Sequence, residues 1–184
     1  RAVSFNQDLS AWDVGNVVNR NVFDEATISW TLPKPNFISP FYLSENGVTV
    51  KAKEGTPIGA KGLLNGVEYT LVNSNQLRFM VTNGDVTTVC TTKITDMTSM
   101  FENRSNFNQD SSNWDVSNVT NMDEMFRGAF SFNQDLSSWD VSNVTNMYLL
   151  FHRATHFDQD IGNWDVSNVK NMSHMFSETG FNQD

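Results

Sequence analysis

The sequence predicts a β-rich, α+β repeat solenoid in which units of 25 residues stack on one another, with a small β-rich module attached. The first observation is that Trp114, Trp139 and Trp164 are each 25 residues apart, within nearly the same phrase. A period of this length is typical of solenoids, because one repeat can bury its apolar face only against its neighbours.

The second observation is that apolar residues sort into columns when the repeats are stacked. Seven of the eight methionines fall in these columns. We interpret the columns as a packed core rather than a ligand box, because methionine fills irregular gaps. The columns are Phe107/Phe132/Phe157, Trp114/Trp139/Trp164, Val116/Val141/Val166, Val119/Val144/Val169, Met97/Met122/Met147/Met172, Met100/Met125/Leu150/Met175 and Phe101/Phe126/Phe151/Phe176.

The third observation is a change of period within each repeat. Apolar residues from Val119 to Ala129 follow a helical or 3₁₀ spacing. The stretch 132–141 is aromatic and β-branched, which suits a short strand. One extended side and one short helical side per unit is a leucine-rich-repeat-like architecture.

Asparagine and aspartate form columns of their own. Neighbouring strands of a solenoid lie about 4.8 Å apart, where like charges repel by roughly 0.9 kcal/mol in water. The aspartates must therefore be hydrated, bonded to turn amides or bridged by cations. We favour turn amides for the column of Asp115 and for the asparagines. Around Asp110 and Asp135, the neighbouring Asn, Gln and Ser residues can hydrate or hydrogen-bond the carboxylate, so we predict no essential metal, with calcium as the alternative. The columns are Asn118/Asn143/Asn168, Asn121/Asn146/Asn171, Asp110/Asp135/Asp160 and Asp115/Asp140/Asp165.

Polar residues that follow the phenylalanine column form the candidate ligand-binding face. Their amide and carboxylate groups suit the hydroxyls of glycans or the backbone of another protein. His152 and His156 are interpreted as surface residues rather than metal ligands, and Cys90 as a buried apolar side chain. The candidate residues are Asn108, Gln109, Asn133, Gln134, Asp158 and Gln159.

The repeats divide the chain into four parts. Residues 1–29 are expected to be the C-terminal end of a preceding array, and 30–40 a proline-rich linker. Residues 41–92 are expected to form the small β-rich capping module, with strands at 48–53, 63–64 and 67–72, a turn at Asn65-Gly66 and a short helix near 74–81. Residues 93–184 form the main array, which stops in mid-repeat.

Composition and motifs exclude several function classes. The chain has a net charge of −9, and residues 93–184 contribute 13 acidic and five basic side chains, which argues against nucleic acid as a partner. No stretch is apolar enough to predict a membrane span. No catalytic or phosphate-binding motif appears, and the carboxylates recur in every repeat instead of forming one distinctive pair. We therefore expect neither an enzyme nor a cofactor.

At 132–154 the repeated phrase begins Phe-Asn-Gln-Asp-Leu-Ser-Ser-Trp-Asp-Val-Ser-Asn-Val-Thr-Asn-Met. The phrase resembles the repeat of BspA-like leucine-rich-repeat surface proteins of bacteria. The resemblance covers 93–184 and 1–26, and the middle of the chain resembles the short module that opens such arrays. It implies a secreted or cell-surface structural protein with a role in adhesion. Its partners would be flanking repeats or other copies of the protein, and glycans or surface proteins. The alternatives are an inert spacer or filament and, as a minor alternative, a carbohydrate-active enzyme.

Overall fold

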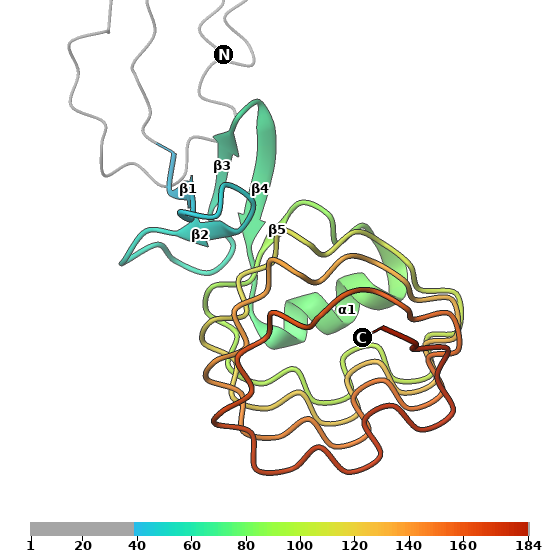
Figure 1. The fold of residues 1–184 in the computed structure, drawn as a ribbon. Coiled ribbons are helices and arrows are strands. Elements are labelled where there is room, and N and C mark those ends of the chain that lie inside the picture. The colour runs from blue at the N-terminus through green and yellow to red at the C-terminus, as the bar shows by residue number, and fades with distance from the viewer. Residues whose placement is uncertain (1–38, 184) are drawn as a thin grey trace, which may run out of the picture.

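The computed structural model describes residues 39–183 (Figure 1). The segment predicted to end a preceding array, 1–29, lies outside the described residues, as does most of the predicted linker. The elements in chain order are β1 (Phe41–Leu43), β2 (Val50–Ala52), β3 (Lys61–Leu64), β4 (Val67–Leu71), α1 (Ser74–Asn83) and β5 (Val89–Cys90).

The strands form two small sheets in the module that precedes the repeats. β1 pairs with β2 in antiparallel register, and β4 lies between antiparallel β3 and parallel β5. The β3–β4 turn is the predicted Asn65-Gly66 pair. Both residues have positive φ, 52° and 83°, as a two-residue hairpin turn of the type favoured by Asn-Gly requires. The hairpin is therefore specified by local sequence.

Helix α1 begins at a capping box. The side chain of Asn73 accepts a hydrogen bond from the backbone of Gln76 at 2.9 Å, and the side chain of Gln76 accepts one from the backbone of Asn73 at 3.1 Å. These reciprocal bonds satisfy amides that the first turn leaves free. At the other end, the N–H of Gly84 donates to the carbonyl of Met80 at 2.7 Å.

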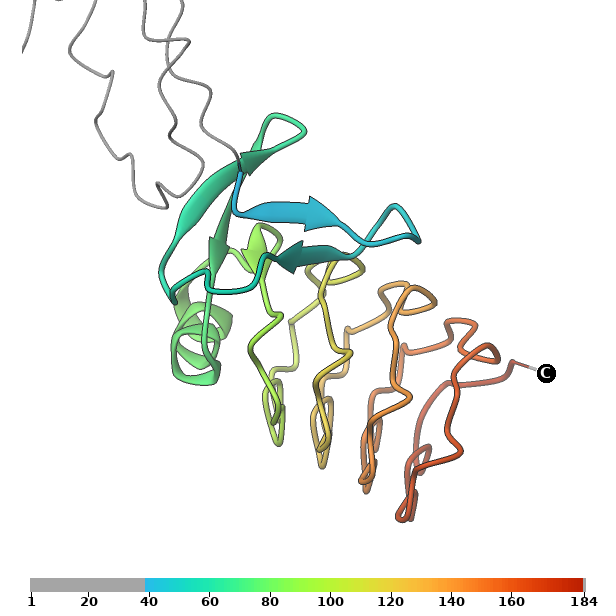
Figure 2. The ribbon, with the colours of Figure 1, turned by 90° about the vertical axis from the view of Figure 1, so that its left-hand side faces the viewer.

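The repeats stack as successive layers, which Figure 2 shows side by side from the module to the C-terminal end. Isolated parallel bridges join each layer to the next, pairing Asp96 with Asn121, Asn121 with Asn146, and Asn146 with Asn171. The partners are 25 residues apart, so the sequence period is also the period of the stack.

The predicted fold class is wrong. The secondary structure consists of the two small sheets and one helix described above, and all of it precedes the repeats. Among the described repeat residues there is neither a strand side nor a helical side; turns and single-residue bridges take their place. A leucine-rich-repeat-like solenoid requires both sides, so the chain does not have that architecture.

The hydrogen bonds of residues 97–104 explain why the helical spacing gives no helix. The N–H groups of Met97, Ser99 and Phe101 donate to carbonyls of the next layer at 2.8–2.9 Å. Between them, the N–H of Met100 donates three residues back to Met97 at 3.1 Å, and the N–H of Thr98 donates to Oδ1 of Asp96 at 2.8 Å. Alternating donors cannot sustain a helix, in which every amide bonds four residues back. The apolar spacing therefore reflects burial without regular helical bonding.

Aromatic columns form the core of the stack, as predicted. Trp114 and Trp139 stack with centroids 6.4 Å apart, and Phe126 stacks on Phe151 at 5.5 Å. In the tryptophan column 114/139/164, each indole N–H donates to a carbonyl of the preceding segment, as from Trp139 to Ser111 at 3.0 Å. Val166 and Met172, in the last described layers, are exceptions to the predicted core, with exposed fractions of 37% and 42%.

The module packs on the first layer and shares its core. Helix α1 lies across the end of the stack in both ribbon views (Figures 1 and 2). Leu77 of α1 belongs to the same buried cluster as Met97 and Phe101, and all three are fully buried. This packing places the end of α1 beside the loop that follows Phe101, where the groove described next is formed.

Candidate functional site

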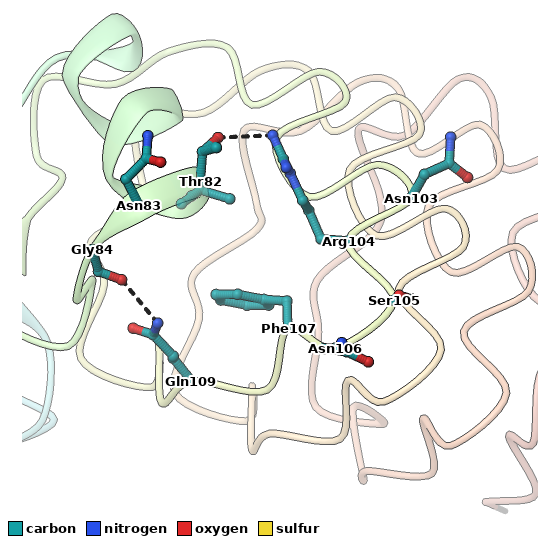
Figure 3. A pocket seen from close by; sticks show the side chains of 10 residues that line it. Thr82, Asn83, Gly84, Asn103, Arg104, Ser105, Asn106, Phe107 and Gln109 are labelled. Atoms are coloured by element: carbon teal, nitrogen blue, oxygen red, sulfur yellow. Dashed lines mark hydrogen bonds between the residues drawn. The ribbon is translucent and has the colours of Figure 1, made fainter.

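A polar groove of about 640 Å³ lies between the end of α1 and the first repeat layer (Figure 3). One side is formed by the last turn of α1 and Gly84, and the other by the loop 103–109. The lining contains no aspartate or glutamate. Its residues are Val81, Thr82, Asn83, Gly84, Asn103, Arg104, Ser105, Asn106, Phe107 and Gln109.

Arg104 is the cation of this groove, and helix α1 holds it. Its Nη2 donates to Oγ1 of Thr82 at 2.7 Å, while that hydroxyl donates to the carbonyl of Arg78 at 3.1 Å. These bonds fix the position of the guanidinium. Only one of its five N–H donors is bonded to the Thr82 hydroxyl. Arg104 is exposed, so the other donors can reach a ligand.

Arg104 differs from the equivalent residues of later layers. Ala129 and Ala154 occupy its column and are fully buried. Other repeat arginines pair with glutamate, Arg127 with Glu102 at 2.7 Å and Arg153 with Glu178 at 2.9 Å. Among the described residues, no carboxylate pairs with Arg104. Within residues 39–183, the first layer therefore carries a cation without a counter-ion.

Gln109 closes the lower side of the groove. Its Nε2 donates to the carbonyl of Gly84 at 3.0 Å, and its Oε1 accepts from the N–H of Val86 at 2.8 Å. Figure 3 shows this side chain pointing at Gly84. One predicted candidate residue thus lies in the groove, where it joins the loop after α1 to the first layer.

The other predicted candidate residues lie in a ladder along the stack. Oδ1 of Asn108 accepts from the N–H of Asn133 and from Nε2 of Gln134, both at 2.9 Å. Asn133 repeats this pattern one layer on. Its Oδ1 accepts from the backbone N–H of Asp158 at 3.0 Å and from Nε2 of Gln159 at 2.9 Å. The structure therefore brings these residues together, and their bonds connect layers.

Aspartates of both columns accept hydrogen bonds from turn amides, although Oδ2 of Asp115 is buried without a partner among the described residues. Oδ1 of Asp135 accepts from the N–H of Ser137 at 2.8 Å, and this bond lowers the pKa of Asp135. Oδ1 of Asp165 accepts from the N–H of Ser167 at 3.0 Å, and hydrogen bonding from the side chain and backbone of Ser167 lowers its pKa. Bonds to a charged carboxylate favour the ionised form. The turn amides predicted for the column of Asp115 are therefore confirmed at Asp165, and Asp135 in the other column is bonded in the same way.

Asp123 has a different environment. Burial raises the pKa of its carboxyl, and the charges of Asp96 and Glu102 raise it further. Its Oδ1 is buried and has no hydrogen-bond partner among the described residues. Partial burial and nearby like charges both favour the protonated form of a carboxyl group. The charged form of Asp123 is therefore disfavoured in the folded chain.

Other candidate chemistry is dispersed. Within 39–183, no three histidine, cysteine, aspartate or glutamate side chains gather as a metal site. The ring nitrogens Nδ1 of His152 and His156 lie 3.0 Å and 2.7 Å from different backbone carbonyls, those of Ser177 and Phe130. Cys90 is buried, and burial raises the pKa of its thiol.

Sequence reasoning missed the contribution of α1 and Arg104 to the groove. Thr82 and Arg104 are 22 residues apart and belong to different parts of the chain. A signal was present in the repeat itself, because arginine at 104 interrupts a column that is alanine in the next two repeats. An interrupted core column marks the place where a different element covers the stack.

The stacked layers of one repeated phrase define a tandem-repeat protein. A family model described as "Mycoplasma protein of unknown function, DUF285" matches residues 1–31 and 71–184. The chain belongs to this family.

Comparison with curated proteins found no match, and comparison with solved structures found none. In the part of the chain that the structure describes, no helix could span a membrane.

Proposed function

We propose that this chain is part of a BspA-like extracellular array at a bacterial surface, with a structural and adhesive role. The family match and the repeated phrase at 93–184 support this proposal. The mechanism is passive display rather than catalysis: stacked layers present polar surfaces, and weak contacts to glycans or surface proteins add along the array. Flanking repeats or other copies of the protein extend the surface.

The observation that carries the adhesive role is the groove between α1 and the first layer. Its polar side chains are amides, hydroxyls and one guanidinium, the groups that recognise sugar hydroxyls and peptide backbone, and Val81 and Phe107 add apolar surface. The contacts of Arg104 with Thr82 and of Gln109 with Gly84 hold the two walls in place. A groove with fixed polar walls loses little side-chain entropy on binding.

The ladder residues reinforce the array in this proposal and bind ligand secondarily. Each asparagine Oδ1 is used between layers, while its Nδ2 and the Oε1 of the neighbouring glutamine remain as polar groups on an exposed or half-buried surface. These groups repeat every 25 residues, at Asn108/Gln134 and Asn133/Gln159. A regular polar surface of this kind suits a polymeric ligand with repeated hydroxyls.

The inert spacer is the second candidate, and one observation favours it. The amide oxygens expected to contact ligand bond instead to the next layer, at 2.9–3.0 Å. In this alternative the polar columns have only the structural role of holding layers in register, and the array separates other parts of a longer protein.

Binding of the full chain to immobilised glycans and surface proteins separates the two functions. The chain is presented as a monomer and at high density on beads. For an adhesive array we expect weak monomer binding and an avidity about 10² to 10⁴ times higher on beads. A spacer gives no binding in either form, and that result would overturn the adhesive proposal.

A further inference from the structure

The groove is lined by one positively charged side chain and by no negatively charged one. The chain carries 21 acidic side chains, yet none lines the groove, and Arg104 faces it without a carboxylate partner among the described residues. The adjacent carboxylate, Glu102, is bound by Arg127 at 2.7 Å. A guanidinium with free donors recognises carboxylates through paired, charge-assisted hydrogen bonds.

Two exposed phenylalanines lie near residues that line the groove, one a helical turn away and the other in the next layer. Phe79 has an exposed fraction of 70% and lies on α1 one turn before Asn83. Nδ2 of Asn83 donates to the carbonyl of Phe79 at 3.3 Å. Phe130, with an exposed fraction of 44%, lies in the second layer, where the next residue, Ser131, donates to the carbonyl of Ser105 at 3.0 Å. A sugar ring has apolar C–H faces and polar hydroxyls at its edge. Exposed aromatic rings suit the C–H faces, and nearby polar side chains suit the hydroxyls.

We infer that this groove binds an acidic glycan through a sugar that carries a carboxylate. Arg104 takes the carboxylate, and the amides of Asn83 and Asn106 take neighbouring hydroxyls. The negative face of the Phe79 or Phe130 ring packs against the C–H face of a sugar. This inference rests on the proposed adhesive function and names the ligand class for the groove.

The test is an NMR titration of the full chain with a galacturonic acid hexasaccharide and with its methyl ester, which has the same rings but no charge. The acid should bind at least about ten-fold more tightly than the ester, as expected for one charge-assisted pair. Arg104→Gln should remove this preference, and Phe79→Ala or Phe130→Ala should weaken binding of both probes. Tyr42→Ala is the matched control, because Tyr42 is exposed to 42% but lies on β1.

The outcomes separate this inference from the proposed function. Equal binding of acid and ester, or acid binding that survives Arg104→Gln, overturns the acidic-sugar inference but leaves glycan adhesion standing. Binding of other glycans or proteins on the beads, with no binding of the hexasaccharide, has the same consequence. Failure to bind any glycan or protein overturns both. Melting curves of each variant verify that lost binding does not come from unfolding, and Thr82→Val provides a second way to release Arg104 without removing its charge.

Discussion

Aspartate in this chain has opposite effects on stability in different positions. Asp135 accepts a turn hydrogen bond from Ser137, so folding favours its charged form. Asp123 is half-buried near Asp96 and Glu102, so folding favours its neutral form. The same residue type in neighbouring layers is therefore stabilising in one place and destabilising in the other.

Asp123→Asn should raise the free energy of unfolding at pH 7, by up to about 1 kcal/mol for a half-buried and partly screened charge. The folded pKa of Asp123 is raised, so its penalty is present at neutral pH and absent below the unfolded pKa of about 3.9. The gain should therefore disappear in acid. Urea unfolding between pH 3 and pH 7 measures this.

Asp135→Asn is the control with the opposite sign. The folded pKa of Asp135 is lowered, so its contribution is present above about pH 3.9 and is lost as pH falls through the folded pKa. The substitution should cost a few tenths of a kcal/mol at pH 7. A gain for Asp135→Asn, or a loss for Asp123→Asn at pH 7, would contradict the assigned environments.

At the scale of the elements, each repeat layer depends on its neighbours. The amides of one layer bond to carbonyls of the next, and aromatic rings stack between them. Tryptophan contributes in two ways, through ring packing and through its indole N–H. Trp139 combines both, since it is 4% exposed and donates to Ser111.

Trp139→Ala should destabilise the chain by about 3–5 kcal/mol, because it leaves a large cavity between two layers. Trp139→Phe should cost less, about 1–3 kcal/mol. It keeps a ring in the core but leaves the Ser111 carbonyl without its donor. Chemical denaturation measures both. A loss below about 1 kcal/mol for the alanine variant would contradict a role for this ring in the core.

Asn73→Ala should destabilise the chain by about 0.5–2 kcal/mol, because it removes one bond of the capping box of α1. Asn75→Ala is the matched control: Asn75 is exposed within the same helix, where alanine is the better helix former. The control should be neutral or slightly stabilising. Equal losses in thermal unfolding would show that the cap has no special role.

At the scale of the whole molecule, side-chain and backbone contacts hold the module against the repeats. Strand β2 contributes Lys51, whose Nζ lies 3.6 Å from Oδ1 of buried Asp115 and 3.2 Å from Oγ of Ser117. The N–H of Val50 also donates to Asn113 at 2.8 Å. These contacts join the two-stranded sheet to the first repeat, as Leu77 joins the helix to it.

Lys51→Ala should cost about 1–3 kcal/mol, because it leaves the buried Asp115 carboxylate without its counter-ion. Lys61→Ala is the control, since the Lys61–Glu68 pair is exposed on both sides and should contribute less than about 0.5 kcal/mol. Urea unfolding measures both variants.

The module and the repeats should unfold together. Urea unfolding of the unchanged chain, followed by tryptophan fluorescence and by far-UV circular dichroism, should give coincident transitions. Separate transitions would show that module and repeats unfold independently.

Local sequence determined much of this structure. The Asn65-Gly66 turn appears where it was expected, because only a few residues accept positive φ at both positions. The aromatic columns are buried because residues at the same place in every repeat meet the same neighbours. Asp165 also bonds to a turn amide as predicted, since its partner lies two residues along the chain.

The tertiary structure decided the form of the repeats and the position of the groove. The helical spacing from Val119 to Ala129 gives turns rather than a helix, because alternate amides bond to the next layer, a partner that no single repeat contains. Arg104 meets Thr82 only because α1 packs across the first layer. Sequence by itself thus determined which residues are buried and how turns close. Hydrogen bonds between layers and the docking of one helix, which join residues more than 20 positions apart, decided the rest.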